Sequence, residues 1–133
     1  MKKLHALTVF STLMLAGCGA LQNLSTEDII QPEYLRRSEV LEMTIPQIQQ
    51  AFYDYSAKCT QLRQPRINPS NPKVALYVEE TIGLSQANPG IVFVFTETGT
   101  ATRVDSYSYS NSFAWPGRVE NIWKAIKNPK QCR

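Results

Sequence analysis

The sequence predicts an α+β domain in which a helix, a three-stranded antiparallel meander and a second helix follow one another. Three observations support this fold class. Apolar residues recur at helical spacing in residues 44–59 and again in residues 115–126, and the chain between them holds three segments of strand character. A meander with one apolar face needs a cover, so both helices are expected on the same face of the sheet.

The first helix is predicted at residues 44–59. Thr44 is a good N-cap residue, and Gln47 three positions later completes a capping-box pattern. Met43 and Ile48 are placed to form a hydrophobic staple across this start. The apolar residues at three- and four-residue steps, which share one face, are Ile45, Ile48, Phe52, Tyr55 and Cys59.

A loop is predicted at residues 60–72, because prolines at positions 65, 69 and 72 interrupt both helices and strand ladders. Three strands are predicted after it, at residues 73–80, 91–96 and 102–110. Gly99 is expected to supply the positive φ of a tight turn between the last two strands. Asn88-Pro89-Gly90 indicates a turn within the longer link at 81–90.

The second helix is predicted to hold Pro116 in its first turn and to end before Asn128-Pro129. The residues that step along one of its faces are Trp115, Val119, Ile122 and Ile126. Trp123 is offset from this stripe, and we expect it to be only partly buried.

The N-terminal residues have the features of an export signal. Lys2 and Lys3 precede a mostly apolar stretch of about a dozen residues, which suits a signal peptide and is shorter than the roughly 20 that a membrane-spanning helix needs. The sequence Leu15-Ala16-Gly17-Cys18 then resembles the lipobox of bacterial lipoproteins at all four positions. This resemblance implies cleavage before Cys18, diacylglycerol on the Cys18 sulfur, and acylation of the new amino terminus. Gly19 stands where an aspartate would favour retention in the inner membrane of enterobacteria, so it favours the outer membrane.

The chain is therefore expected to consist of a cleaved lipoprotein signal peptide (1–17), a lipid-anchored tether (18–40) and one small domain (41–133). One alternative for the tether stays open. Some of its apolar residues, which include Ile29, Ile30, Tyr34 and Leu35, could lie against the domain or form a short edge element through Val40 and Leu41.

Composition excludes several classes of function. Cleavage would remove the single histidine, His5, and with it histidine-based nucleophilic and acid–base catalysis and nearly all transition-metal sites. Without Lys2 and Lys3 the chain has 12 basic and 11 acidic residues, a net charge of +1, and no basic stripe that would follow nucleic-acid phosphates. We expect no metal, no cofactor and no nucleic-acid partner.

The cysteines have separate roles in this prediction. Cys18 carries lipid, which leaves Cys59 and Cys132 as two thiols in an exported domain, where paired cysteines normally form a disulfide. There is no Cys-x-x-Cys spacing to indicate redox activity. A structural disulfide between Cys59 and Cys132 is expected.

Catalysis by carboxylates is not expected either. The acidic residues considered for it follow no motif that would bring two carboxylates together as in a glycosidase; they are Glu79, Glu80, Glu97, Asp105 and Glu120. We therefore expect that the protein is not an enzyme.

The segment 107–115 has the composition of a protein-binding surface, in which rigid aromatic side chains alternate with small polar ones. The candidate partner-binding residues are Tyr107, Tyr109, Phe113 and Trp115. Two other interpretations remain open: a half-buried edge strand that runs into the next helix, with Trp115 in the core, and an exposed strand edge that accepts a partner's strand.

These observations favour an outer-membrane lipoprotein with a non-catalytic periplasmic domain that binds an envelope protein and is accessory to an assembly or secretion complex. Its layout is similar to that of the small lipoproteins that assist outer-membrane protein assembly, although those have both helices before the strands. One alternative is an inhibitor of a periplasmic or host enzyme, of the lysozyme-inhibitor kind, which would use a protruding loop such as 60–72 or 81–90. Another is a binder of a small hydrophobic or cell-wall ligand, which requires a cavity between helices and sheet.

Overall fold

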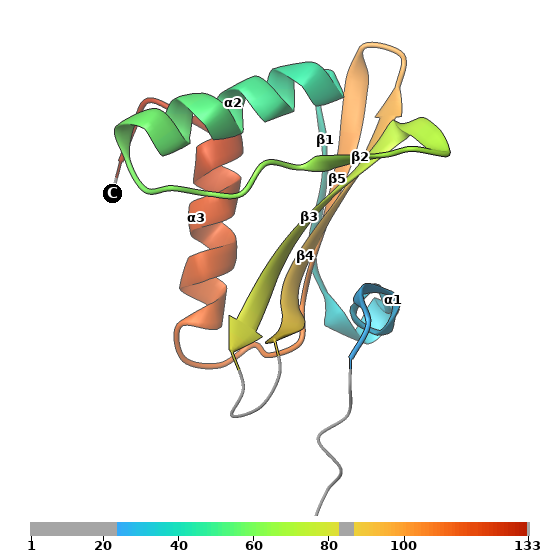
Figure 1. Ribbon diagram of the computed structural model, residues 1–133, viewed down its shortest axis with the longest axis vertical. Coiled ribbons are helices and arrows are strands. Elements are labelled where there is room, and N and C mark those ends of the chain that lie inside the picture. The colour runs from blue at the N-terminus through green and yellow to red at the C-terminus, as the bar shows by residue number, and fades with distance from the viewer. Residues whose placement is uncertain (1–23, 83–86, 133) are drawn as a thin grey trace, which may run out of the picture.

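The computed structural model of the chain describes residues 24–82 and 87–132. Its centre is a five-stranded antiparallel sheet of strand order β1-β5-β4-β3-β2. Helices α2 and α3 lie on one face of this sheet, and the short α1 lies on the other (Figure 1). In chain order the elements are α1 (Thr26–Ile29), the 3₁₀ helix η1 (Pro32–Tyr34), β1 (Leu35–Leu41), α2 (Ile45–Lys58), β2 (Arg66–Asn68), β3 (Asn71–Ile82), β4 (Ala87–Thr98), β5 (Ala101–Ser108) and α3 (Trp115–Lys127).

The predicted three-stranded meander is wrong, because the sheet has a further strand at each edge. β1 lies within the stretch predicted as a tether and pairs antiparallel with β5. β2 lies within the predicted 60–72 loop and pairs with β3. Both are edge strands, where charged residues and nearby prolines are tolerated because one side of the ladder faces solvent.

The two long central strands also extend further than predicted. Asn88 and Pro89, predicted as part of a turn, instead pair with Thr81 and Glu80 inside the β3–β4 ladder. The register shifts beside them, between Glu79 and Glu80, so that Gly90 is an extra residue in β4. A bulge of this kind accommodates a proline that cannot donate to the ladder. The predicted positive φ of Gly99 is confirmed, at 67°.

The start of α2 is the one predicted from the capping box. The Thr44 backbone N–H donates to Gln47 Oε1 at 2.8 Å, and the Gln47 N–H donates to Thr44 Oγ1 at 3.5 Å. The Ile45 N–H in turn donates to Glu97 Oε2 at 2.7 Å, which joins the helix start to β4. The negative charge of this carboxylate also interacts favourably with the dipole of α2 at its N-terminus.

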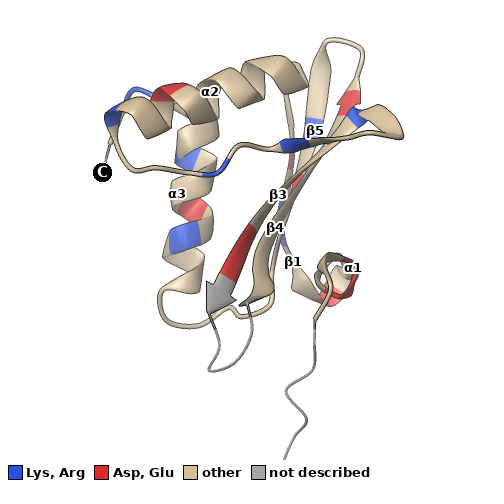
Figure 2. Ribbon diagram, viewed as in Figure 1, with Lys and Arg blue, Asp and Glu red and all other residues tan. Residues whose placement is uncertain are grey.

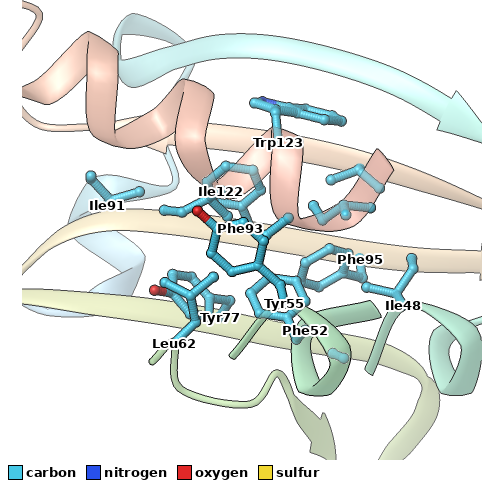
Figure 3. Close-up of a cluster of buried hydrophobic side chains, with 14 of the residues drawn as sticks. Ile48, Phe52, Tyr55, Leu62, Tyr77, Ile91, Phe93, Phe95, Ile122 and Trp123 are labelled. Atoms are coloured by element: carbon cyan, nitrogen blue, oxygen red, sulfur yellow. The ribbon is translucent and has the colours of Figure 1, made fainter. Parts of the chain in front are cut away.

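The core fills the space between the sheet and the two long helices. The aromatic rings of Phe52, Tyr77, Phe93 and Phe95 meet there, with the Phe52 and Tyr77 centroids 5.2 Å apart (Figure 3). Trp123 was predicted to be partly buried, and this is wrong, because only 1% of it is exposed. Its ring lies 5.6 Å from that of Phe93, and its indole N–H donates to Ser106 Oγ at 3.1 Å. The buried arc of α3 is thus wider than a single stripe.

The second face of the sheet is covered at one end by α1. Ser25 caps this helix by accepting from the Asp28 N–H, and α1 contacts β4. Ile29 of α1 and Val92 of β4 are both fully buried outside the main core cluster. Within residues 24–82 and 87–132, no helix has the length and hydropathy needed to cross a membrane.

The predicted disulfide between Cys59 and Cys132 is present. Cys59 is the C-cap residue of α2, and Cys132 lies in the tail that follows α3. The two Cα atoms are 5.2 Å apart. The bond therefore holds the tail that follows α3 against the end of α2.

Candidate functional site

The predicted partner-binding residues lie within and directly beside one connection, the β5–α3 loop (residues 109–114). Tyr107 belongs to β5, Tyr109 and Phe113 to the loop, and Trp115 is the first residue of α3. The loop lies at the opposite end of the sheet from the β4–β5 hairpin, and α1 lies towards this same end (Figure 1).

Phe113 is the most exposed large apolar residue of the described chain, at 99%. Its φ is 55°, in the left-handed region that a bulky residue enters only at a cost. The loop around it is held by short polar contacts: Ser108 Oγ donates to the Ser110 carbonyl at 2.6 Å, and the Trp115 N–H donates to the Ser112 carbonyl at 3.3 Å. Phe113 therefore projects into solvent from a loop with a defined backbone.

The other three aromatic residues are placed differently. Tyr109 is 50% exposed, its ring centroid is 5.5 Å from that of Tyr34 in η1, and its N–H donates to the Gly90 carbonyl at 3.0 Å. Trp115 is partly buried against the core cluster. Tyr107 pairs with Val92 on one side and Leu35 on the other. The four side chains do not form one patch, and Tyr109 and Phe113 are the two that the structure presents to solvent.

The strand that carries Tyr107 is not an exposed edge. β5 lies between β1 and β4, so its hydrogen-bonding groups are engaged on both sides. The edges of the sheet are β1 and β2 instead. A partner strand could not add next to Tyr107 without displacing β1.

The carboxylates considered for catalysis all have partners that hold elements together. Glu79 of β3 accepts from Tyr77 Oη at 2.8 Å and from Arg118 Nε at 2.5 Å, which links the strand to α3. Asp105 accepts from Arg103 Nε at 3.0 Å and from Ser38 Oγ. Glu97 is bound to the start of α2, and the remaining two pair with arginines: Glu80 with Arg63 and Glu120 with Arg37. In the described part of the chain, no group of three His, Cys, Asp or Glu side chains could hold a metal ion.

Two pockets open beside the first turns of α3. One, of about 230 Å³, is mostly apolar and is lined by Glu79, Ile91, Ala114, Trp115 and Arg118. The other, of about 150 Å³, lies between β1, the β5–α3 loop and α3, and we call it the arginine pocket. The residues that define its character are Arg36 and Arg37 of β1, Ser110 and Asn111 of the loop, and Glu120 and Trp123 of α3.

The two guanidinium groups of the arginine pocket have different surroundings. The Arg37 guanidinium carbon lies 4.5 Å from the centroid of the Trp123 ring, and Arg37 forms ion pairs with Glu39 and Glu120. Arg36 Nη2 donates to the Ser108 carbonyl at 2.7 Å, and Nη1 donates to the Glu33 carbonyl at 3.4 Å. Across the described residues, no carboxylate forms an ion pair with Arg36.

This pocket was not predicted from the sequence. Consecutive residues of a regular strand point to opposite faces, so Arg36 and Arg37 gave no reason to expect a shared site. The pair Arg36-Arg37 is the sequence signal, and it becomes informative only once the irregularity in β1 is known. Charge is otherwise mixed over the fold, with positive and negative residues interspersed along α3 (Figure 2).

Cys18, the predicted lipid attachment site, lies outside the described residues. Comparison of the chain with protein-family models, with curated proteins and with solved structures found no match.

Proposed function

We propose that the protein is an outer-membrane lipoprotein whose periplasmic domain binds another envelope protein through the β5–α3 loop. The observation that carries this proposal is the state of Phe113, which is 99% exposed and has a φ of 55°. An exposed apolar ring on a strained backbone is costly in the free domain. Burial against a partner would repay that cost, since exposed aromatic residues commonly become anchors of protein interfaces.

The interior of the domain supports an outward-facing role. Aromatic and aliphatic side chains occupy the space between the sheet and the long helices, where a small hydrophobic ligand would otherwise have to lie (Figure 3). The 60–72 segment, which an enzyme inhibitor of the kind considered would use as a protruding loop, is joined to β3 through β2. The apolar pocket beside α3, at about 230 Å³, is smaller than the roughly 300–1,000 Å³ of small-molecule sites. Partner binding is therefore the function that we favour over both alternatives.

The position of the loop also fits an anchored protein. The lipobox places the anchor at Cys18, six residues before Leu24, and six residues span at most about 20 Å when extended. The β5–α3 loop lies at the same end of the sheet as α1, which follows Leu24 (Figure 1). A partner bound by this loop would therefore lie on the side of the domain that faces the membrane.

The anchor is tested by substitution of the lipobox cysteine. Cys18→Ala should abolish incorporation of labelled palmitate and remove the protein from the outer-membrane fraction, because no acyl chains would be attached. Gly19→Asp is the matched variant, since it should keep the lipid and move the protein to the inner-membrane fraction. Recovery of the Cys18→Ala protein in the outer membrane would contradict the proposed anchor.

Partner binding is tested by a photo-cross-linking phenylalanine analogue at position 113 in cells. We expect a discrete cross-linked protein adduct from position 113 and none from position 53, since Tyr53 is an equally aromatic residue that is 63% exposed on α2. Phe113→Ser should weaken recovery of the same partner by about tenfold or more. It should leave the free energy of unfolding within about 0.5 kcal/mol, as for other exposed positions. Adducts to lipid alone, or equal adducts from both positions, would contradict a protein partner at this loop.

A further inference from the structure

We propose that the arginine pocket binds the C-terminal carboxylate of a polypeptide, with Arg36 as the cation that receives it. This inference rests on the proposed function, because the pocket shares Ser110 and Asn111 with the loop that presents Phe113. It goes further by naming the part of the partner that would be recognised.

A bulge in β1 builds the pocket. Leu35 is opposite Tyr107 and Arg37 is opposite Ser106, so Arg36 is an extra residue with no position of its own in the β1–β5 ladder. A bulge bends the strand and re-aims a side chain, which is why bulges are frequent beside binding sites. Here it brings two consecutive arginines to the same pocket, although a regular strand would separate them.

Arg36 is left without a compensating charge. The described arginines at positions 37, 63, 103 and 118 each pair with a carboxylate, whereas Arg36 and the exposed Arg66 do not. Arg36 Nε is buried, and no acceptor reaches it within the described chain. The shortest hydrogen bond that Arg36 donates, at 2.7 Å, is to the neutral Ser108 carbonyl. An anion beside this guanidinium would add charge-assisted hydrogen bonds, which are stronger than those to neutral carbonyls.

The composition of the pocket points to a carboxylate with a small apolar group attached. Around the pocket, Arg36, Arg37 and Lys127 contribute three positive charges, and their ion-pair partners Glu39 and Glu120 contribute two negative charges. One positive charge is left for the ligand to balance. A doubly charged phosphate would meet the Glu120 carboxylate, so a singly charged anion suits the site better. Pro116, Val119 and the Trp123 ring supply the apolar lining, and the exposed Asn111 can donate from its amide. A cavity of about 150 Å³ can hold a group of the size of benzene, which is comparable to the side chain of a small apolar terminal residue.

The test compares the tripeptide acetyl-Ala-Ala-Val as free acid and as C-terminal amide. Both are titrated against the purified full-length protein by calorimetry and by the shift of the Trp123 indole N–H resonance, which Trp115→Phe assigns. The acid should bind at least about tenfold more tightly than the amide, because it alone forms charge-assisted hydrogen bonds to Arg36. Arg36→Gln should remove this preference, and Arg66→Gln, which makes the same change in net charge, should keep it.

Several outcomes would overturn the inference. Equal binding of acid and amide to the wild-type protein, or no binding of the acid at millimolar concentration, would exclude a carboxylate site without reference to any variant. Tighter binding of a peptide that ends in D-Ala-D-Ala would assign the pocket to cell-wall peptides and reject a protein C-terminus. A Phe113-dependent cross-link would survive each of these results, so the failure of this inference is distinguishable from failure of the proposed function.

Discussion

Tyr77 is a buried phenol whose pKa is higher in the folded state than in the unfolded chain. It is 2% exposed, and its hydroxyl donates to Glu79 Oε2 at 2.8 Å. Burial raises the pKa of Tyr77 most, and the Glu79 charge and hydrogen bond raise it further, while Arg118 opposes them. The unfolded chain loses this proton near pH 10. The folded state retains it to higher pH, so its stabilising contribution is complete below about pH 10 and is lost as the pH rises beyond that value.

This predicts a difference in alkaline stability between the wild type and Tyr77→Phe. Above about pH 10 the free energy of unfolding of the wild type should fall by up to about 1.4 kcal/mol per pH unit more steeply than that of the variant, which has no proton to lose at position 77. Urea unfolding at a series of pH values measures both slopes. Tyr107, whose pKa is also raised by burial, is present in both proteins and cancels. Parallel slopes would show that the Tyr77 proton does not contribute.

Trp123 shows why some residue environments could not be predicted. Its outer side is covered by cations: the Arg37 guanidinium lies 4.5 Å and the Lys127 ammonium 5.4 Å from the ring centroid. Arginine and lysine do not contribute to an apolar stripe, although their stems and charged heads cover aromatic rings well. Phe113 was predicted as a candidate partner-binding residue only from the composition of segment 107–115. Nothing in the sequence indicates the positive φ of Phe113, since glycine and asparagine are the residues that usually occupy that region.

At the scale of elements, local signals predicted local structure. The capping box of α2 and the turn at Gly99 depend on residues a few positions apart, and both are confirmed. β1 was left open as an edge element because its sequence, Leu-Arg-Arg-Ser-Glu-Val-Leu, alternates weakly. Its partner β5 comes much later in the chain, with Leu35 opposite Tyr107. Such pairing depends on packing against neighbours rather than on intrinsic strand propensity.

Near the start of β4, a short sequence is compatible with two local structures, a turn and a β-bulge. Asn88-Pro89-Gly90 has turn composition, yet these residues belong to β4 and form its irregularity, with Gly90 as the extra residue. Proline and glycine favour a turn and a bulge for the same reasons, a missing donor and backbone freedom. The strand pairing around them decides between the two, and that pairing is a property of the whole sheet.

At the scale of the molecule, the candidate site is assembled by tertiary structure. The arginine pocket combines Arg36 and Arg37 of β1 with residues from one much later stretch, 108–123, which runs from the end of β5 through the loop into α3. The sequence predicted the loop with Tyr109 and Phe113, because that part is continuous in the chain. It could not predict Arg36 and Arg37 beside the loop, since their placement needs both the β1–β5 register and its bulge.

The disulfide joins the end of α2 to the tail that follows α3, and it permits the last prediction. Cys59 and Cys132 are separated by 73 positions, a loop that contains four strands and α3. Closing a loop of this length restricts the unfolded chain and stabilises the fold by about 4 kcal/mol in the chain-entropy model. The double variant Cys59→Ser/Cys132→Ser should lose about that amount in urea unfolding. The wild type in reducing agent should match it, and the double variant should not respond to reduction. An unchanged wild-type midpoint on reduction would mean that the buried face of α3 alone holds the C-terminal end of the domain in place.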